Sequence, residues 1–595
     1  MIPLSKNESA ELIAKFDIMV QQLSTERASF MREWRDINDY IKIRGARFVA
    51  SNVNRGEGRT RFILDSSATE DLSTLAAGMS SGMTTQLRPW FKLRHAEDEF
   101  AELESVKRYY HVFTRRLRHF FSRTNFYNTM GATYSGAGAF GTHAIFMEKV
   151  PKDKKINYRS IPLGSYYIAT GPDGMVNTFV REISMSVRQI IEKFGREHAG
   201  EEIMRQAKEG GLDNRFVVTH AIVPNNDYDQ FSALSNKKKF TSIYYQEATE
   251  SRGTASRTGQ QNAKAGRQVF SIGGYDKFPV LCVRWYRDDG DDYGTDCPGM
   301  MALPDVKQLQ FQERMIAKAV AKKVSPPTIG PSNLLKEGLR SGPDDHNFYD
   351  GTGDPKGLRA LYEVDFDIAA MEKKQDGCRS RIGRKFYVPY FLAMLSSDRR
   401  QITAREVDER HAEKSQVLGP VLEQLTQDLF GPAIEYAVDY MSEIGEAPEP
   451  PEEILGREYN IQYVSVMALA QLAGHLANLE RFSGFVADLA ANEMKLKGTS
   501  EAMDKVDQDE LIEEYGDLTG IKPTIIRNSD KVAALREQRA AEAEQQAAAQ
   551  NAETQSKSLK NLAEAGKAAE GLELPGNPGA LDQAAAPLDV FEDAG

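Results

Sequence analysis

The residues whose spacing most suggests chemistry are three glycines, Gly136, Gly138 and Gly141, which match the G-x-G-x-x-G fingerprint of dinucleotide-binding enzymes. That fingerprint needs a strand before it and a helix after it, because the pyrophosphate must meet the first turn of a helix. Here helical spacing precedes the glycines and a strand-like run that starts at His143 follows them. The order is reversed, so the sequence predicts a tight crossing from helix to strand and no cofactor site.

An acidic cluster, Asp288, Asp289, Asp291 and Asp292, offers carboxylate oxygens of the kind that bind divalent cations. The same composition is typical of a polar, solvated turn, and we favour that interpretation. His411 lies inside a stretch of helical spacing, where we expect a surface histidine rather than a catalytic base. No metal ligand and no catalytic group is therefore predicted.

The three cysteines, Cys282, Cys297 and Cys378, lie far apart and form no CxxC pair. Disulfide frameworks and zinc sites need clustered cysteines, so we expect buried, reduced thiols. The sequence also lacks the G-x-x-x-x-G-K-[ST], H-E-x-x-H and G-x-S-x-G motifs. These observations predict a protein that is not an enzyme.

Composition narrows the class further. The 595 residues suffice for about three to five domains or subregions. The net charge of −11 argues against a protein that grips DNA, because strong binding needs basic groups to neutralise only about 6–10 phosphates. No apolar run reaches the roughly 18–20 residues that cross a bilayer, and the first 17 residues do not resemble a signal peptide. We expect an intracellular product with no membrane association.

Helical spacing dominates the first 140 residues, and a strand-like period follows. The predicted helices lie at about 12–41, 67–86, 103–121 and 126–135. The predicted strands lie at 143–147, 157–161, 175–183, 216–223, 243–246, 268–272 and 280–286. These elements predict an α+β first half.

Two helices with narrow apolar stripes are predicted in the middle of the chain, at about 299–325 and 366–388. Pro304 suits the first turn of the first helix, and about forty residues rich in Gly, Pro and Asp join the two. A helix with so narrow an apolar face is not a core element of a monomer, so we expect lateral neighbours. Basic residues gather on both helices, at Lys318, Lys322, Lys323, Arg379, Arg381, Arg384 and Lys385.

The segment 389–402 is apolar at its start and arginine-rich at its end. Thr403 and Glu406 then form a capping box that opens a helix to about Met441. The Gly-Pro pairs at 419–420 and 431–432 interrupt this helix and predict two kinks. Further helices are expected after residue 451, including a lone helix at 532–569 with little to bury, and the residues from 571 are expected to be disordered.

Five short motifs, in this order and spacing across about residues 10–530, resemble the podoviral head-to-tail connecting (portal) proteins of short-tailed bacteriophages. The motifs are Leu87-Arg88-Pro89-Trp90-Phe91-Lys92-Leu93, Tyr293-Gly294 with Ala302-Leu303-Pro304-Asp305-Val306-Lys307, Ile402-Thr403-Ala404-Arg405-Glu406-Val407, Leu418-Gly419-Pro420-Val421 and Tyr463-Val464-Ser465. Each motif alone is a weak pattern. Their order and spacing give the resemblance its specificity.

The resemblance implies a portal-type subunit, α+β and predominantly α-helical, that assembles into a dodecameric ring. It assigns 1–298 to the wing, 299–325 and 366–388 to the stem helices, 326–365 to the clip, 389–402 to the channel (tunnel) loop, 403–450 to a long kinked wing helix and 451–530 to the crown. The Ala/Glu/Gln-rich tail, 531–595, matches no pattern of the family. We assign it no role.

The implied function is that of a portal: a ring-shaped channel at one capsid vertex through which double-stranded DNA is packaged and ejected. The implied partners are the terminase large subunit, tail adaptor and tail tube proteins, and the major capsid and scaffolding proteins. The implied location is the virion, after assembly in the host bacterial cytoplasm.

We hypothesise that part of the 389–402 segment narrows the channel. The candidates are Phe391, Leu392, Met394, Leu395, Arg399 and Arg400. Apolar contacts would touch DNA without the counterion release that makes basic surfaces bind tightly. An equally plausible alternative is that these residues pack the segment against the stem. The basic residues of the two stem helices likewise either compensate helix dipoles or repeat as rings of charge facing neighbours, DNA or partners.

Two rival functions remain. One is another virion structural or adaptor protein without a channel role, although such proteins are usually much shorter. The other is a nucleic-acid-processing enzyme, against which the acidic charge and the missing nucleotide-binding motif count. A membrane-surface protein is discounted, since no basic amphipathic segment is present.

Overall fold

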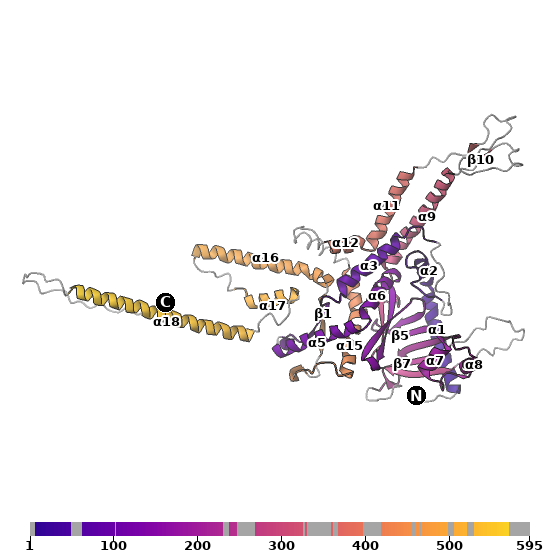
Figure 1. The fold of residues 1–595 in the computed structure, drawn as a ribbon, viewed down its shortest axis with the longest axis horizontal. Coiled ribbons are helices and arrows are strands. Elements are labelled where there is room, and N and C mark those ends of the chain that lie inside the picture. The colour runs from indigo at the N-terminus through magenta and orange to yellow at the C-terminus, as the bar shows by residue number, and fades with distance from the viewer. Residues whose placement is uncertain are drawn as a thin grey trace, which may run out of the picture. The chain divides into compact units, whose positions relative to one another are not determined.

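The computed structural model describes residues 6–48, 62–101, 103–229, 237–246, 268–324, 328–329, 359–360, 367–396, 418–454, 458–464, 466–497, 505–519 and 529–569. The chain divides into two compact units, Met1–Pro523 and Thr524–Gly595. The first unit mixes helices and sheets, and helix predominates, as the sequence predicts (Figure 1). Among the described residues, no helix is both long and apolar enough to cross a bilayer.

The elements of the first half follow the predicted order closely. The helices are α1 (Lys6–Ala28), α2 (Met31–Tyr40), α3 (Ser67–Met83), α4 (Asp98–Ala101), α5 (Glu104–Arg123), α6 (Phe126–Phe140), α7 (Val187–Phe194) and α8 (Glu201–Lys208). The strands are β1 (Phe91–His95), β2 (Thr142–Val150), β3 (Lys155–Ile161), β4 (Tyr166–Thr170), β5 (Val176–Ser186), β6 (Arg215–Pro224), β7 (Phe240–Gln246), β8 (Val269–Tyr275) and β9 (Val280–Arg284). Helices α7 and α8 and strand β4 were not among the predicted elements.

The second half is mainly helical. Its longer elements are α9 (Pro298–Val324), α11 (Ile368–Lys385), α12 (Val388–Ser396), α14 (Gly419–Leu425), the π-helical turn η5 (Thr426–Phe430), α15 (Gly431–Glu443), α16 (Val466–Lys497), α17 (Gln508–Thr519) and α18 (Ser529–Ala569). The short strands are β10 (Thr328–Ile329), β11 (Arg359–Ala360) and β12 (Tyr459–Tyr463). Helix α18 lies in the second unit, and the predicted lone helix is confirmed there.

A five-stranded antiparallel sheet, in the order β4-β5-β6-β7-β8, carries helices on both faces. Side chains alternate between the faces of a strand, so Tyr244 and Tyr245 of β7 point in opposite directions. Tyr245 packs in a cluster with Ile13 and Phe16 of α1. Tyr244 packs in a cluster with Phe194 of α7 and Ile203 of α8. Figure 1 shows these two helices beside the sheet. The sheet is therefore the middle layer of three.

The largest core surrounds α3, α5, α6 and the sheet β3-β2-β9. Trp34, Trp90 and Trp285 are all fully buried in it. Trp90 stacks on Phe126 with ring centroids 5.9 Å apart. Its neighbouring strand β1 pairs antiparallel with β12, from Phe91 opposite Tyr463 to His95 opposite Tyr459. The motif around Trp90 thus joins the two ends of the first unit.

The glycine pattern at 136–141 is the helix-to-strand crossing that the sequence predicts. Helix α6 ends at Gly141, whose left-handed φ of 79° turns the chain directly into β2. A Cβ at Gly141 would lie 2.3 Å from the carbonyl oxygen of Gly294, so the site needs both the conformation and the small size of glycine. The glycine pattern therefore permits the close packing of two backbone segments at this crossing.

Three predictions need correction. Helix α9 begins at Pro298, so Pro304 lies inside the helix and Pro298 takes the terminal position expected of Pro304. Strand β12 was not predicted in the segment after residue 451, because its residues alternate too weakly between buried and exposed. Residues 389–396 of the predicted loop form most of α12, since Pro389 is tolerated in a first helical turn.

Each of the two Gly-Pro pairs lies at the start of a helix. The pair at 419–420 opens α14, and the pair at 431–432 opens α15 directly after the π-helical turn. A proline lacks the N–H that an α-helical turn would use, and the wider π turn accommodates the second pair. The capping box of Thr403 and Glu406, His411 and the tail from Gly571 lie outside the described residues.

Candidate functional site: the paired helices and the segment after them

Helices α9 and α11 pack against each other and share a buried base (Figure 1). From α9 the base takes Val306 and Leu309, and from α11 it takes Cys378, Ile382 and Phe386, all at most 1% exposed. These residues recur at helical spacing, so one face of each helix turns inward. Helices α2, α3 and α6 also contact α9 and complete the base.

The outer turns of both helices bury almost nothing. From Glu313 to Val324 no side chain of α9 is buried, and no described side chain of α11 is buried before Gln375. Phe311 is 60% exposed and Val324 is 81% exposed. Most helical stability in proteins comes from packing rather than propensity. The outer turns therefore need neighbours that the described residues of one chain do not supply.

Ion pairs tie the base of α11 to its surroundings. Arg379 contacts Asp65, Glu313 and Asp376, each at 2.8 Å. Burial would raise the pKa of Asp65, but hydrogen bonds from Ser67 and Arg379 outweigh it and hold the pKa below its ordinary value. The charge of Arg379 is thus engaged within the chain.

A second group of ion pairs lies on the other side of the base. Asp305 of α9 accepts hydrogen bonds from Arg381 at 3.1 Å and from Lys385 at 2.6 Å. Burial alone would raise the pKa of Asp305, yet these two cations lower it. Three of the seven basic candidates, Arg379, Arg381 and Lys385, therefore make intramolecular ion pairs and fix α11 on α9.

The other four basic candidates are exposed. Lys318, Lys322 and Lys323 lie on the last two turns of α9, and Arg384 lies on the exposed side of α11. Lysines in the last turn of a helix also offset its negative dipole end. The seven basic candidates thus form two groups. Three make ion pairs that hold the base together, and four are exposed to solvent.

The segment after α11 turns back through Tyr387, whose φ of 56° is left-handed and unusual for an aromatic residue. Helix α12 follows and buries Tyr390 and Phe391. The Phe391 ring lies so close to Gly78 of α3 that a Cβ there would stand 2.1 Å from it. Phe391 is thus buried against α3, whereas the alternative left open by the sequence has the segment pack against the stem helices.

Leu392 is 53% exposed and remains available to face a channel. Met394 and Leu395 belong to α12, but their side chains lie outside the described residues. Arg399 and Arg400 lie wholly outside them. The structure therefore brings one candidate, Phe391, into the core and leaves Leu392 on the surface.

One buried ion pair was not predicted from the sequence. Arg284 at the end of β9 contacts Asp428 in the π-helical turn, and both side chains are 1% exposed. Gln424 donates a further hydrogen bond to Asp428 at 2.9 Å. Burial would lower the pKa of Arg284, but the hydrogen bonds and charge of Asp428 raise it above its ordinary value. An unbroken apolar run around Arg284 was the only signal that it is buried.

The acidic cluster and the three cysteines, which the sequence offered as candidates for chemistry, have structural roles. Asp292 accepts hydrogen bonds from the backbone N–H and the hydroxyl of Thr170, at 2.8 and 2.6 Å, and so ties the acidic loop to the end of β4. In the described ranges, no three His, Cys, Asp or Glu side chains lie together as a metal site. Cys282, Cys297 and Cys378 are free and buried, as predicted.

Residues 14–526 match the family model described as "Bacteriophage head to tail connecting protein". The chain is 32% identical over 540 residues to the "Portal protein" of Salmonella phage epsilon15, covering 90% of this chain and 93% of that protein. It is 34% identical over 532 residues to the "Probable portal protein" of Bordetella phage BPP-1, covering 89% and 91%.

Among solved structures, a chain from the "Virion of native gene transfer agent (GTA) particle" overlays on 72% of this chain and 99% of its own length. Its sequence identity is 11% and the TM-score is 0.29.

Proposed function

The chain belongs to the family of bacteriophage head to tail connecting proteins, and from this premise we propose how its parts serve a portal. Its role is that of the portal, the head-to-tail connector of a phage. The observation that carries this conclusion is the identity of 32% and 34% to two phage portal proteins over about nine-tenths of the chain. We place the protein in the virion, at one capsid vertex.

We propose that twelve copies form a closed ring. The support is the exposure of the outer turns of α9 and α11, where Phe311 and Val324 lack cover from the described chain. In a cyclic assembly each such face meets a different face of the next copy, so a single type of contact repeats until the ring closes. The helix pair is then the stem, residues 326–365 are the clip and 451–530 the crown.

The proposed channel passes double-stranded DNA during packaging and ejection. Lys318, Lys322, Lys323 and Arg384 stay exposed on the stem and would repeat around the ring. Of the candidates whose side chains are described, Leu392 is exposed and is proposed to face the channel, and Met394, Leu395, Arg399 and Arg400 are proposed beside it. The net charge of −11 suits a conduit, because a strongly basic wall would hold DNA by counterion release.

Different parts of the subunit would bind different partners. The clip would dock the terminase large subunit during packaging and the tail adaptor and tail tube proteins afterwards. The wing would contact the major capsid and scaffolding proteins as the subunits assemble in the host cytoplasm. The protein itself would provide a passage and docking surfaces, with no catalytic role.

Electron microscopy of the purified full-length protein tests this function directly. We expect rings with a central hole, and mass photometry should give a mass close to twelve chains. A compact monomer at every concentration would contradict the proposal. ATPase and nuclease assays on the same preparation test the rival function, a nucleic-acid-processing enzyme. Hydrolysis of ATP or of nucleic acid by the pure protein would support that rival.

A further inference from the structure

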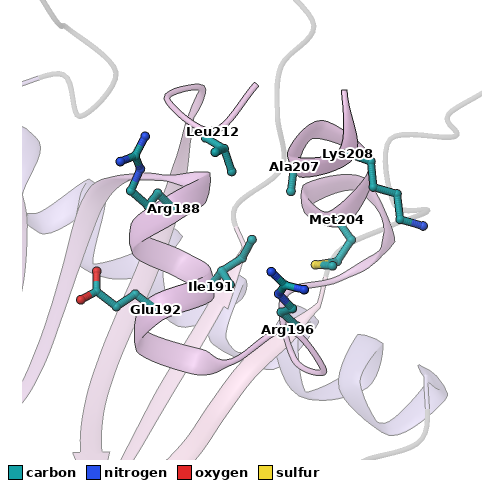
Figure 2. Close-up of a pocket in the computed structure, with 8 residues that line it drawn as sticks. All are labelled: Arg188, Ile191, Glu192, Arg196, Met204, Ala207, Lys208 and Leu212. Atoms are coloured by element: carbon teal, nitrogen blue, oxygen red, sulfur yellow. The ribbon is translucent and has the colours of Figure 1, made fainter. Parts of the chain in front are cut away.

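Helices α7 and α8 form a groove on the face of the five-stranded sheet opposite α1. Its volume is about 580 Å³. Figure 2 shows Ile191 of α7 and Met204 of α8 pointing toward the space between the two helices, with Leu212 on the loop above. The groove lies far in sequence from the stem and belongs to no part of the site described above.

Capping residues and glycines determine where α7 ends and where α8 begins. Ser186 and Gln189 form a capping box that starts α7, and Gly195 ends it with φ of 84°. The link closes at Gly200, with φ of 82°, directly before α8. Glycines with positive φ at both ends of a six-residue link turn the chain sharply, so the helices lie beside each other.

Both helices bury their inner faces and leave an apolar strip outside. Val187, Ile190 and Ile203 are fully buried against the sheet. Ile191 and Met204 are only half-buried, and Leu212 is 37% exposed. A concave apolar strip with a polar rim is the usual form of a peptide-binding groove.

The rim of the groove is basic, although the chain as a whole is acidic. Arg188, Arg196 and Lys208 line it, against the single carboxylate of Glu192. Arg188 also lies 3.7 Å from Asp213, but both side chains are mostly exposed and such a pair contributes little. The groove therefore presents an excess of positive charge around an apolar floor.

We propose that this groove binds an acidic, amphipathic segment of another protein. Apolar side chains of the segment, one helical turn apart, would fill the strip between Ile191 and Met204. Its carboxylates would meet Arg196 and Lys208 at the rim. Apolar contacts supply most of the affinity in such grooves, and rim charges set orientation and selectivity.

A protein segment fits these observations better than nucleic acid or a small anion. A phosphate backbone would gain from the three cations but would meet the apolar floor and Glu192. A small anion would leave the floor empty. An acidic amphipathic segment matches both the floor and the rim. This inference stands apart from the portal role, because it needs neither a ring nor DNA.

The test uses the full-length chain and a fluorescein-labelled synthetic peptide of about 14 residues, roughly four helical turns. The peptide carries leucine at every third or fourth position, glutamate beside the leucines and alanine elsewhere. Fluorescence anisotropy should show saturable binding. In Lys208→Glu and Arg196→Glu the dissociation constant should rise about tenfold, and Leu212→Asp should weaken binding similarly.

The matched control is Arg205→Glu. It makes the same charge change on α8, but Arg205 does not line the groove and is 64% exposed. We expect a change of no more than about twofold, as for a remote exposed charge. Circular dichroism of each variant confirms that the fold is retained.

Four results would overturn the proposal. They are the absence of binding to the wild-type chain, an equal loss in Arg205→Glu, equal binding of a peptide with lysine in place of glutamate, and full competition by inorganic phosphate alone. A fifth is loss of self-assembly in Leu212→Asp, which would make the groove a contact between copies of this chain.

Discussion

Arg284 and Asp428 form a doubly hydrogen-bonded ion pair inside the core, with Nε–Oδ2 and Nη2–Oδ1 distances of 2.9 and 2.8 Å. The pair joins the last residue of β9 to the π-helical turn between α14 and α15. It therefore holds the junction between α14 and α15 on the three-stranded sheet β3-β2-β9.

Asp428→Ala should destabilise the protein strongly, because it leaves the guanidinium of Arg284 buried without a counter-charge. The expected cost is about 3–5 kcal/mol, measured as a lower midpoint of denaturant unfolding. The control is Asp439→Ala on α15, which removes the carboxylate of an exposed ion pair with Lys277. That change should cost at most about 1 kcal/mol. Equal effects of the two substitutions would show that the buried pair is unimportant.

Gly78→Ala should disturb the seat of α12. The new methyl group would overlap the buried Phe391 ring, whose nearest atom would lie 2.1 Å away. We expect a loss of about 1–3 kcal/mol, as for overpacked cores. Gly377→Ala on α11 is the matched control, since its Cβ would meet nothing within 4 Å. That substitution should stabilise the helix by up to about 1 kcal/mol, so a similar loss in both would contradict the packing described for α12.

Phe391 and Leu392 should behave differently although they are neighbours. Phe391→Ala removes a ring that is 1% exposed and should cost about 3–5 kcal/mol in unfolding experiments. Leu392→Ala should change stability by less than about 0.5 kcal/mol, because that side chain is 53% exposed. In phage carrying Leu392→Ala, we expect intact rings but altered DNA retention. Unaltered retention would remove Leu392 from the proposed channel.

Phe311→Asp tests the outer face of α9. The side chain is 60% exposed, so the isolated chain should keep its unfolding midpoint. In a ring, however, the new carboxylate would be buried against a neighbour without a partner, and assembly should fail. Gln308→Asp introduces the same charge at another exposed position of α9. Rings that form equally well with both variants would place Phe311 outside the contact between subunits.

Stability should fall as the pH drops below about 6.5, because His143 is buried as the neutral ring. Burial, followed by the nearby charge of Lys42, lowers the pKa of His143 from 6.5 to about 3. The unfolded chain thus binds more protons between these two values. The stabilisation is complete above about 6.5 and is lost towards 3, at about 1.4 kcal/mol per pH unit.

Unfolding midpoints measured between pH 7 and pH 5 check this dependence. In His143→Gln, where an amide replaces the ring that contacts Ser160, the slope with pH should be shallower. His119 is exposed, so His119→Gln should leave the slope unchanged. A slope that His143→Gln does not alter would assign the pH dependence to other groups.

The sequence predicted the elements well where one period ran unbroken. Helix α5 and strands β2 and β6 each repeat one spacing over several turns or residues, so both type and place followed. Proline was a weaker guide. Pro304 was read as a helix start, but the packing of Val306 and Ala302 on the core carries α9 back to Pro298.

Contacts between distant segments were beyond sequence reasoning. Arg284 pairs with a residue 144 positions away, and nothing in either local pattern names its partner. The basic residues of α11 showed the same limit. Their spacing could not separate Arg379 and Arg381, which acidic side chains hold at the base, from the exposed Arg384.

The pairing of β1 with β12 has a consequence for synthesis. Strand β1 lies near the start of the chain, and its partner is one of the last elements of the first unit. While a ribosome is still making the protein, β1 must wait with its edge open until Tyr463 has emerged. A nascent chain thus cannot close this strand pair, which borders the core around Trp90, until the ribosome has made residues 459–463.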